Sequence, residues 1–244
     1  MNRQPSDPFR VAAVGDLHCR EDHRGRFREL VRDANAQAHV LLLCGDLTDR
    51  GLPREATTLA EELSALRIPC LAVFGNHDVE AGHADEVEAI LARVGVRLLS
   101  GDHSVVEKYL GVAGVKGFGG GYGSATLQAF GEGTVRAYVQ EAVNESLRLE
   151  AALGQLDTPR KVVITHYAPI PGTTEGENPE IRPFLGTSRL MGPIDRYGAQ
   201  VVFHGHAHDG TPEGRTDKGV PVFNVAYPLL RRQEPPQRFK LYEL

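Results

Sequence analysis

The chain has 244 residues, of which 41% are apolar and 24% charged, which is ordinary globular usage and argues against a fibrous or disordered chain. The net charge of -5 is mildly acidic, so nucleic acid is not an expected partner. The longest apolar runs have the length of strands, far below the roughly 20 residues that span a bilayer, so no membrane partner is expected either.

Residues 1–8 are polar and lack the apolar stretch of a signal peptide, so we interpret them as a short N-terminal tail of a cytoplasmic protein. The cysteines Cys19, Cys44 and Cys70 are odd in number and widely spaced, which favours reduced thiols over a disulfide framework. We find no interdomain linker and no internal repeat, so a single domain over residues 1–244 is predicted. The sequence leaves the oligomeric state open.

Three short apolar runs occupy residues 9–14, 40–44 and 70–74, and each ends at a motif that contains glycine. This pattern is typical of buried strands that lead into functional loops. Apolar residues at helical spacing lie between these runs, in residues 27–34 and 52–66. The alternation of strands and helices predicts a parallel sheet with the motifs at its carboxyl edge.

The second half of the chain alternates less regularly. Helices are predicted at residues 87–94, 135–153 and 190–194. The remaining strands are predicted at residues 96–99, 105–115, 161–165, 200–203, 220–225 and 239–242. This count predicts an α/β fold in which two mixed β-sheets pack face to face, with helices outside both.

Five clusters of metal-binding residue types follow the predicted strands. In chain order they are Gly15-Asp16-Leu17-His18, Gly45-Asp46-Leu47-Thr48-Asp49, Gly75-Asn76-His77-Asp78, His166 and Gly205-His206-Ala207-His208. A run such as Gly-Asn-His-Asp occurs by chance roughly once in 10⁵ positions, so several such runs in order leave little room for coincidence. Carboxylate, amide and imidazole groups suit manganese, iron or zinc, and two such ions can hold a phosphoryl group for attack by water.

With these motifs, the chain resembles the calcineurin-like metallophosphoesterase superfamily over about residues 11–208. The resemblance implies a four-layered α/β/β/α sandwich with a dinuclear metal site at one rim. It makes His77 the proton donor to the leaving oxygen. It implies the following ligands: Asp16, His18 and His208 for the first metal, Asn76, His166 and His206 for the second, and Asp46 as the bridge between both.

Elementary chemistry agrees with these implied roles. A carboxylate such as Asp46 is the side chain best able to join two cations about 3.5 to 4 Å apart. A water that bridges the ions gains nucleophilicity because coordination lowers its pKa, so hydroxide is available for in-line attack on phosphorus. Asp78 is predicted to orient the His77 imidazole or to favour its protonated form. Asp49 is predicted to hydrogen-bond to a ligand and fix its direction.

A cysteine mechanism is one alternative, because Cys44 and Arg50 have the C-x5-R spacing of cysteine-dependent phosphatases. The same loop contains Asp46 and Asp49, whose charges would repel phosphate and raise the pKa of the thiol. We therefore interpret the spacing as accidental.

Other features allow two interpretations. His204 has the strand parity of His206, and we favour a structural role over a role in the site. The glycine-rich residues 117–123 form a substrate-facing loop or, in the safer interpretation, a turn. The segment 167–186 is predicted to shape the substrate entrance. Arg182 and Arg189 are candidates for phosphate contact, or else solvated surface residues.

The leading hypothesis is a hydrolase of phosphate esters, a phosphomonoesterase or phosphodiesterase, that uses two divalent ions, with manganese or iron preferred and zinc as the alternative. Its expected substrate is a small molecule or a nucleotide. Cyclic-nucleotide phosphodiesterases and repair nucleases of the superfamily are alternatives, although the former usually carry His-His-Pro-Pro where this chain has His166-Tyr167-Ala168-Pro169. A catalytically weak metal-binding scaffold that recruits a partner protein is the hypothesis from another class, and the intact ligand set argues against it.

Overall fold

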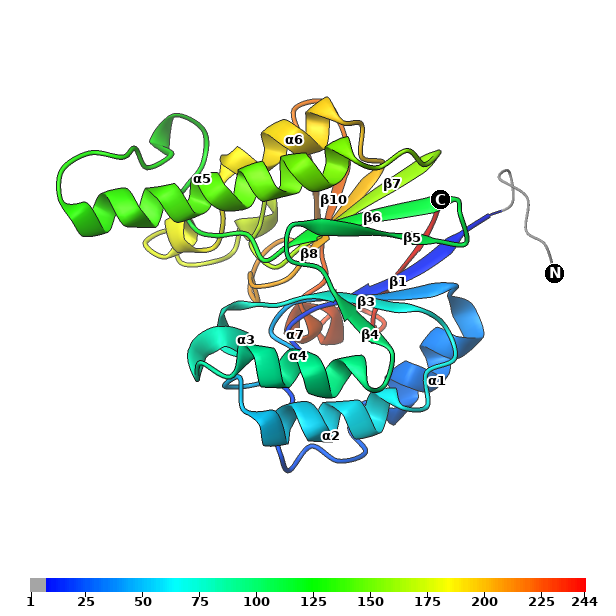
Figure 1. The fold of residues 1–244 in the computed structure, drawn as a ribbon. Helices are drawn as coiled ribbons and strands as arrows, with labels where there is room; N and C mark the ends of the chain where they lie inside the picture. Colours follow the sequence, from blue (N-terminus) through cyan, green and yellow to red (C-terminus); the bar gives the residue numbers. More distant parts are fainter. Residues whose placement is uncertain (1–7) are drawn as a thin grey trace.

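A computed structural model describes residues 8–244, which form two mixed β-sheets that pack face to face (Figure 1). Residues 1–7, nearly the whole of the predicted tail 1–8, lie outside the described residues. Strand order is β11-β1-β2-β3-β4 in the first sheet and β5-β6-β7-β8-β10-β9 in the second. The central strands of each sheet run parallel, and β11, β5 and β9 are the antiparallel additions.

The strands of the first sheet are β1 (Arg10–Val14), β2 (Val40–Cys44), β3 (Cys70–Val73), β4 (Val96–Leu98) and β11 (Lys240–Glu243). Those of the second sheet are β5 (Asp102–Val106), β6 (Leu110–Val115), β7 (Arg160–Thr165), β8 (Val201–His204), β9 (Glu213–Arg215) and β10 (Pro221–Asn224). The helices are α1 (Arg28–Gln37), α2 (Pro53–Leu63), α3 (Asn76–Glu80), α4 (Ala84–Ala92), α5 (Gly133–Gly154), α6 (Met191–Arg196) and α7 (Tyr227–Arg231). Helices α1, α2 and α4 cover the outer side of the first sheet, and α5 and α6 cover that of the second (Figure 1).

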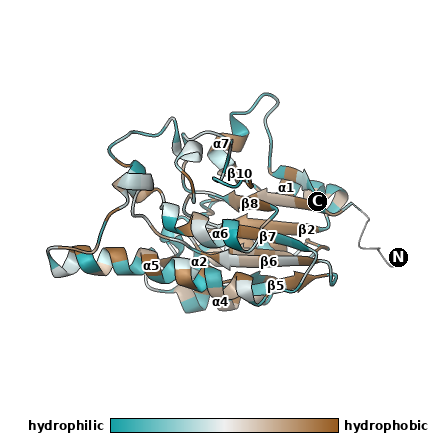
Figure 2. Cartoon of the chain, turned by 90° about the horizontal axis from the view of Figure 1, so that it is seen from above, coloured by the Kyte–Doolittle hydropathy of each residue, from teal (hydrophilic) through white to brown (hydrophobic). Residues whose placement is uncertain are grey.

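Side-chain alternation along β7 and β8 explains why the second sheet is covered on both faces. Val162 and Ile164 belong to the core shared with the first sheet, whereas Val163 packs in the core under α5 and α6. In β8, Phe203 lies in the core shared with the first sheet, and Val202 lies in the core under α5 and α6. Because successive side chains of a strand point to opposite faces, an unbroken apolar run supplies both cores. Strands β2 and β8 are coloured mainly as hydrophobic in Figure 2, whereas β7 begins with the polar Arg160 and Lys161.

The structure confirms the predicted α/β/β/α sandwich and adds elements that the sequence did not suggest. The predicted β region 105–115 is split between β5 and β6 by a hairpin turn in which Glu107 and Lys108 both have positive φ. Such turns favour asparagine and glycine, so the Glu-Lys pair gave no signal. Helix α3 begins inside the Gly-Asn-His-Asp motif, where a loop was predicted. The short elements β9 and α7 were not predicted either.

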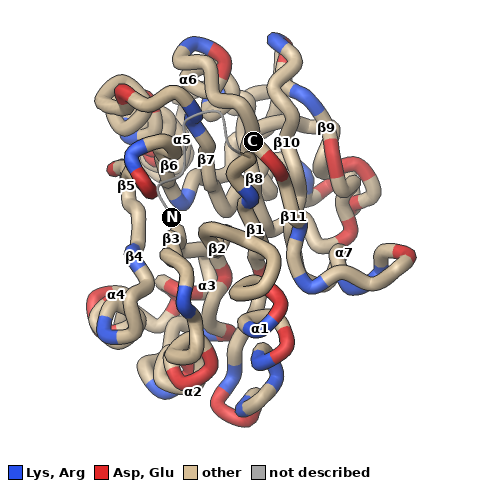
Figure 3. The backbone as a smooth tube through the Cα atoms, turned by 90° about the vertical axis from the view of Figure 1, so that its right-hand side faces the viewer, with Lys and Arg blue, Asp and Glu red and all other residues tan. Residues whose placement is uncertain are grey.

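Two surface observations bear on the expected partners. Within residues 8–244, no helix has both the length and the apolar character needed to cross a membrane. Acidic and basic residues are intermixed along α1, α2 and α4 in the backbone view of Figure 3. The three cysteines are buried and free, as the sequence predicts.

Candidate metal centre

Loops from both sheets meet where the parallel strands end, and they carry all seven predicted ligands. The ligands are Asp16 and His18 after β1, Asp46 after β2, Asn76 at the start of α3, His166 after β7, and His206 and His208 after β8. Strand β1 packs against β8 and β2 against β7, so these loop ends are neighbours. The backbone joins them further, since Gly205 N–H donates to the His166 carbonyl and Asp16 N–H to the Gly45 carbonyl.

One cluster of donor atoms consists of Asp16, His18 and His208, whose ligand atoms all lie within 4.8 Å of one another. His208 Nε2 is 2.9 Å from Asp16 Oδ1 and 3.5 Å from His18 Nε2. The Asp16 carboxylate is buried and also accepts a hydrogen bond from the backbone N–H of His206. The three side chains therefore converge on one point from opposite ends of the sequence.

A second cluster consists of Asp46, His166 and His206. His166 Nε2 lies 3.4 Å from Asp46 Oδ2 and 3.0 Å from Asn76 Oδ1. The other ring nitrogen of His166, Nδ1, is 3.0 Å from the Cys44 carbonyl oxygen. Since a carbonyl only accepts, Nδ1 carries a proton and Nε2 is the atom presented to the cluster.

Asp46 lies between the two clusters. Its Oδ2 atom is 3.7 Å from His18 Nε2 and 3.4 Å from His166 Nε2, so one carboxylate contacts ligands of both groups. A third group of donor atoms, formed by His18, Asp46 and His77, also contains it. This geometry is the one expected of a bridging ligand.

The donor set fits hard to borderline divalent cations. Two buried carboxylates, Asp16 and Asp46, face imidazoles and the amide oxygen of Asn76, and the clusters of the described residues include no thiolate. Nitrogen and oxygen donors of this mixture suit manganese, iron or zinc. Buried carboxylates are costly without a compensating positive charge, so a bound cation would offset that cost.

Charge within the clusters sets the protonation of the ligands. Burial raises the pKa of Asp46, but the neighbouring His166 outweighs burial and holds the pKa below its usual range. For His166, burial lowers the pKa, yet the Asp46 carboxylate raises it to about 9. Burial instead lowers the pKa of His206 to about 3. In the absence of an ion, His166 therefore carries a proton that a metal must displace, whereas His206 is already neutral.

Four of the predicted ligands have a positive φ, a backbone conformation that residues other than glycine rarely adopt. The φ angles are 55° at Asp16, 42° at His18, 48° at Asp46 and 71° at His206. A left-handed conformation costs a residue with a Cβ atom about 1–2 kcal/mol. Each of these residues follows a strand end, and the sharp turn there aims its side chain along the sheet edge towards the other motifs.

The glycines of three motifs make room for a predicted ligand from another motif. A Cβ atom on Gly75 would overlap Asp46 Oδ1, and one on Gly205 would overlap Asp16 Oδ2. A Cβ atom on Gly45 would strike the imidazole of His166. The motifs therefore interlock through the backbone as well as through their ligands.

His77 lies at the edge of the two clusters with its side chain partly exposed. Its Nδ1 atom is 2.6 Å from the Asp49 carbonyl oxygen, and its ring meets that of His18 edge to face at 4.7 Å. The Asp49 carboxylate lies 3.8 Å from His18 Nδ1. Asp49 therefore holds His77 through its backbone, while its carboxylate faces the predicted ligand His18 at a distance longer than the hydrogen bond predicted from the sequence.

Asp78 occupies a different place from the one predicted. The sequence suggests that it orients His77, but its buried carboxylate accepts from the backbone N–H groups of Leu47, Thr48 and Gly75 and from the Thr48 hydroxyl. Burial raises the pKa of Asp78 to about 6. Instead of contacting the His77 imidazole, the Asp78 carboxylate joins the Asp46 loop to the start of α3, because these donors surround both of its oxygens.

The arginines considered for phosphate contact are used elsewhere. Arg182 donates to the Thr174 hydroxyl and the Pro171 carbonyl, and Arg189 donates to the Leu127 carbonyl. These bonds fasten the loop after β7, so neither guanidinium is directed into the metal clusters.

His204 and Cys44 have structural surroundings. His204 is buried, with Nε2 2.8 Å from the Thr173 hydroxyl, which fixes the short 3₁₀ turn Gly172–Thr174. Cys44 is also buried, and burial with the charge of Asp16 raises the pKa of its thiol well above the usual value. A neutral, enclosed thiol is a poor nucleophile, which agrees with interpreting the C-x5-R spacing as accidental.

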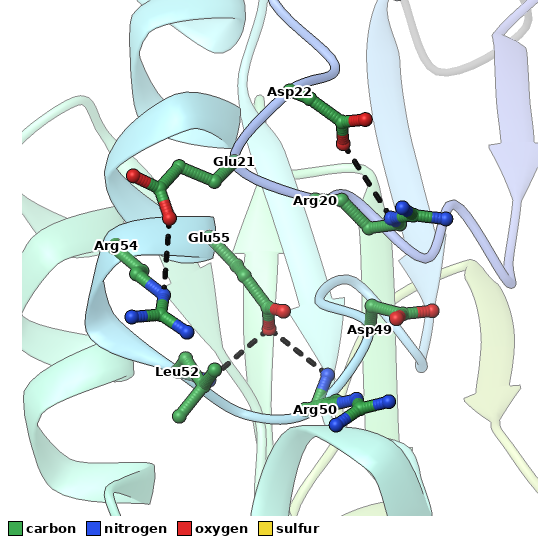
Figure 4. A pocket seen from close by; sticks show the side chains of 8 residues that line it. All are labelled: Arg20, Glu21, Asp22, Asp49, Arg50, Leu52, Arg54 and Glu55. Atoms are coloured by element: carbon green, nitrogen blue, oxygen red, sulfur yellow. Dashed lines mark hydrogen bonds and ion pairs between the residues drawn. The ribbon is translucent and has the colours of Figure 1, made fainter.

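A cavity of about 670 Å³ adjoins the clusters through Asp49, and its lining combines three arginines with four acidic residues and a leucine: Arg20, Arg50, Arg54, Glu21, Asp22, Asp49, Glu55 and Leu52 (Figure 4). Arg20 and Arg54 form exposed ion pairs with acidic neighbours. Arg50 is anchored by its backbone N–H, which donates to the Glu55 carboxylate, while its guanidinium forms no hydrogen bond or ion pair within residues 8–244. Sequence reasoning passed over Arg50 as a group that could contact substrate, although it directly follows Asp49.

Comparison with known proteins agrees with this architecture. The family model described as calcineurin-like phosphoesterase matches residues 9–210. A phosphopantetheinyl hydrolase from Mycobacterium tuberculosis superposes with a TM-score of 0.66 at 18% identity, covering 95% of each chain. The protein TT1561 from Thermus thermophilus superposes at 0.63 and 17% identity, covering 98% of this chain and 99% of the other. Identities this low show a shared fold only. No curated protein matches the chain at a significant level.

Proposed function

Because this chain belongs to the family of calcineurin-like phosphoesterases, which are metal-dependent hydrolases of phosphate esters, we propose that it works through a dinuclear site built from its two donor clusters. The observation that supports this most directly is the position of Asp46, whose carboxylate contacts a histidine of each cluster. The alternative of an inert scaffold has no comparable support in the geometry.

The proposed ligands follow the two clusters. Asp16, His18 and His208 would hold one ion, Asn76, His166 and His206 the other, and Asp46 both. Manganese or iron suits the prominence of imidazole among these donors, and zinc is the alternative. When bound, such ions supply a water of lowered pKa and positive charge for the phosphoryl oxygens.

The remaining chemistry belongs to the chain itself. The Asp49 carbonyl accepts from Nδ1 of His77, which leaves Nε2 to deliver a proton to the leaving oxygen. Asp78 keeps the loop of Asp46 fixed against the start of α3, and His77 N–H donates to Asp46 Oδ1. The proton donor and the bridging carboxylate are therefore held in one hydrogen-bonded unit, which limits their relative movement.

The substrate proposed for this site is a small phosphate ester, a monoester or a diester. The cavity beside Asp49 has a volume of about 670 Å³, which is that of an ordinary small-molecule pocket, and Arg50 brings a positive charge to it among its acidic neighbours. Arg50 is the group there best placed to contact an anionic substrate, because Arg20 and Arg54 are ion-paired, whereas the Arg50 guanidinium forms no hydrogen bond or ion pair in the described part of the chain.

The test is hydrolysis by manganese-loaded protein of 4-nitrophenyl phosphate and bis(4-nitrophenyl) phosphate, with Asp46→Asn as the matched variant. Turnover of either ester that is lost, together with metal, in Asp46→Asn would support the proposal. The ratio of the two rates separates a monoesterase from a diesterase. Metal-replete protein that hydrolyses neither ester, nor nucleotides, cyclic nucleotides or sugar phosphates, would contradict it and favour the scaffold.

A further inference from the structure

An aromatic strip runs from the candidate metal centre onto the loops after β6 and β7. We define it as Tyr167, Phe118, Tyr138 and Phe184. The ring of Tyr167 lies 4.5 Å from the ring of the predicted ligand His206. Phe118 follows at 5.8 Å from Tyr167, Tyr138 at 4.8 Å from Phe118, and Phe184 at 6.3 Å from Tyr138. The four rings form a continuous series that starts at the metal ligands.

Exposure increases along the aromatic strip. Tyr167 is 7% exposed, Phe118 and Tyr138 are partly buried, and Phe184 is 59% exposed. Four of the eight exposed large apolar side chains in residues 8–244 lie in the same two segments, 117–132 and 172–190: Leu127, Phe130, Ile181 and Phe184. These segments and the first turns of α5 project beyond the sheets (Figure 1). Exposed apolar side chains gathered beside a polar site indicate a binding surface.

The loops hold the rings in fixed positions. The N–H groups of Gly120 and Gly121 both donate to the Pro183 carbonyl, so the glycine-rich segment is fastened to the loop that carries Phe184. A Cβ atom on Gly119 would overlap the Tyr138 hydroxyl, so glycine is what allows that ring to approach. Lys116 Nζ lies 4.9 Å from the ring centre of Phe118, a cation–π contact. Rings that are already positioned lose little entropy when a ligand binds.

We infer that the aromatic strip binds a planar aromatic group, such as a nucleobase, on the organic part of the phosphate ester whose phosphoryl group lies at the metal clusters. This inference rests on the proposed function and adds the substrate feature that the enzyme selects. Phe118, Tyr138 and Phe184 are its specificity-determining residues.

The choice of an aromatic group over an aliphatic one follows from the side chains that are present. Neighbouring rings are inclined to one another by 40° to 80°, so they offer both faces and edges to a flat ligand. Aromatic pairs gain energy in stacked and edge-to-face arrangements beyond their buried area. A base stacks on such rings whatever its identity, so we expect selection for a base without strong choice among bases.

The experiment compares adenosine 5′-monophosphate with ribose 5-phosphate, which share the leaving oxygen and differ by the base. The manganese-loaded wild-type protein is expected to prefer the nucleotide by about 10- to 100-fold in kcat/KM, the range that stacking of one base supports. Phe184→Leu and Tyr138→Leu are expected to reduce this preference about 5-fold or more, through KM. Tyr138→Phe, which retains the ring, is expected to retain the preference.

Leu147→Ala is the matched control. Leu147 is an exposed apolar residue of α5, nine positions after Tyr138 and therefore about half a turn around the helix from it. Its substitution is expected to leave the nucleotide preference at the wild-type value. An equal loss of preference in Leu147→Ala and Phe184→Leu would overturn the inference, because the aromatic strip would then have no special part in it.

Binding without turnover separates this inference from the proposed function. Adenosine, which has no phosphate, is expected to bind wild-type protein in a calorimetric titration, while ribose does not, and Phe184→Leu is expected to weaken adenosine binding. Hydrolysis of both esters with no preference, or a preference for an alkyl phosphate, overturns the inference and leaves the function intact. If no ester is hydrolysed, the proposed function fails, and adenosine binding alone decides on the aromatic strip.

Discussion

Raising the pH should lower the free energy of unfolding of the metal-free protein and raise its affinity for metal, and His166 contributes to both effects. Its pKa is about 9 in the folded chain against 6.5 ordinarily, because Asp46 lies 3.4 Å away. The difference of about 2.5 units corresponds to about 3 kcal/mol, counted once for the pair. Since the folded pKa is raised, this stabilisation is complete below pH 6.5 and is lost as the pH rises to about 9.

Metal binding has the opposite dependence on pH, because a ligand imidazole must release its proton. At pH 7, two units below the pKa of His166, the apparent affinity should be about 100-fold below its value above pH 9, and it should rise about tenfold per unit between. His206 adds nothing to this slope, since its pKa of about 3 leaves it neutral throughout.

Two measurements test this reasoning. The Tm of chelator-treated protein should fall by about 6–12 °C between pH 6.5 and 9, given about 2–4 °C per kcal/mol for a chain of this size. Calorimetric titration with Mn²⁺ at pH 7, in buffers of different ionisation enthalpy, should show release of about one proton at this position. His166→Gln should weaken both dependences and leave the part contributed by His208, whose pKa Asp16 raises against the effect of burial. A metal-free Tm that is constant or rises, with Mn²⁺ affinity independent of pH, would refute the assignment.

Three further predictions follow from the contacts of the site. His77→Asn should retain metal and lower kcat by about 10²- to 10⁴-fold, the range for a lost general acid. A parallel loss of metal would instead make His77 a ligand, which its cluster with His18 and Asp46 allows. Asp78→Asn should lower the free energy of unfolding, measured in urea, by about 2–3 kcal/mol, since an amide cannot accept from all four surrounding donors. Thr48→Val should lower it by about 1 kcal/mol. Equal costs in the two variants would contradict this account. Arg50→Ala should raise KM for phosphate esters about tenfold, as expected for one lost charge-assisted hydrogen bond. Arg54 is ion-paired, so Arg54→Ala should change KM little. An unchanged KM in both variants would remove Arg50 from the site.

The sequence predicted which side chains the fold brings together, because each predicted ligand lies just after a strand end. Buried apolar strands are readable from composition alone, and parallel strands bring their carboxyl ends to one edge, so the positions of Asp16, Asp46 and Asn76 followed from local pattern. The histidines of the second sheet followed in the same way, since His166 and His206 come directly after β7 and β8.

Contacts between loops were less predictable, because they depend on approaches that sequence spacing does not encode. Asp78 looked like a partner for its neighbour His77, but its carboxylate is surrounded by N–H groups that the loop after β2 brings in. Arg182 and Arg189 looked free, yet backbone carbonyls of distant segments accept their protons. The exposed ring of Phe184 likewise gained significance only once the fold placed it beside Tyr138.

A Cβ atom at Gly75 or Gly205 would overlap a predicted ligand that belongs to another motif, so mutations in different motifs cannot act independently. A side chain at Gly75 or Gly205 would displace Asp46 or Asp16 even if every ligand were retained. Such a substitution combined with loss of the displaced carboxylate should cost less than the two separate effects together. In a lineage that abandons metal binding, the glycines should therefore diverge as early as the ligands, so a relative with intact ligands but a bulky residue at either glycine has already lost the site.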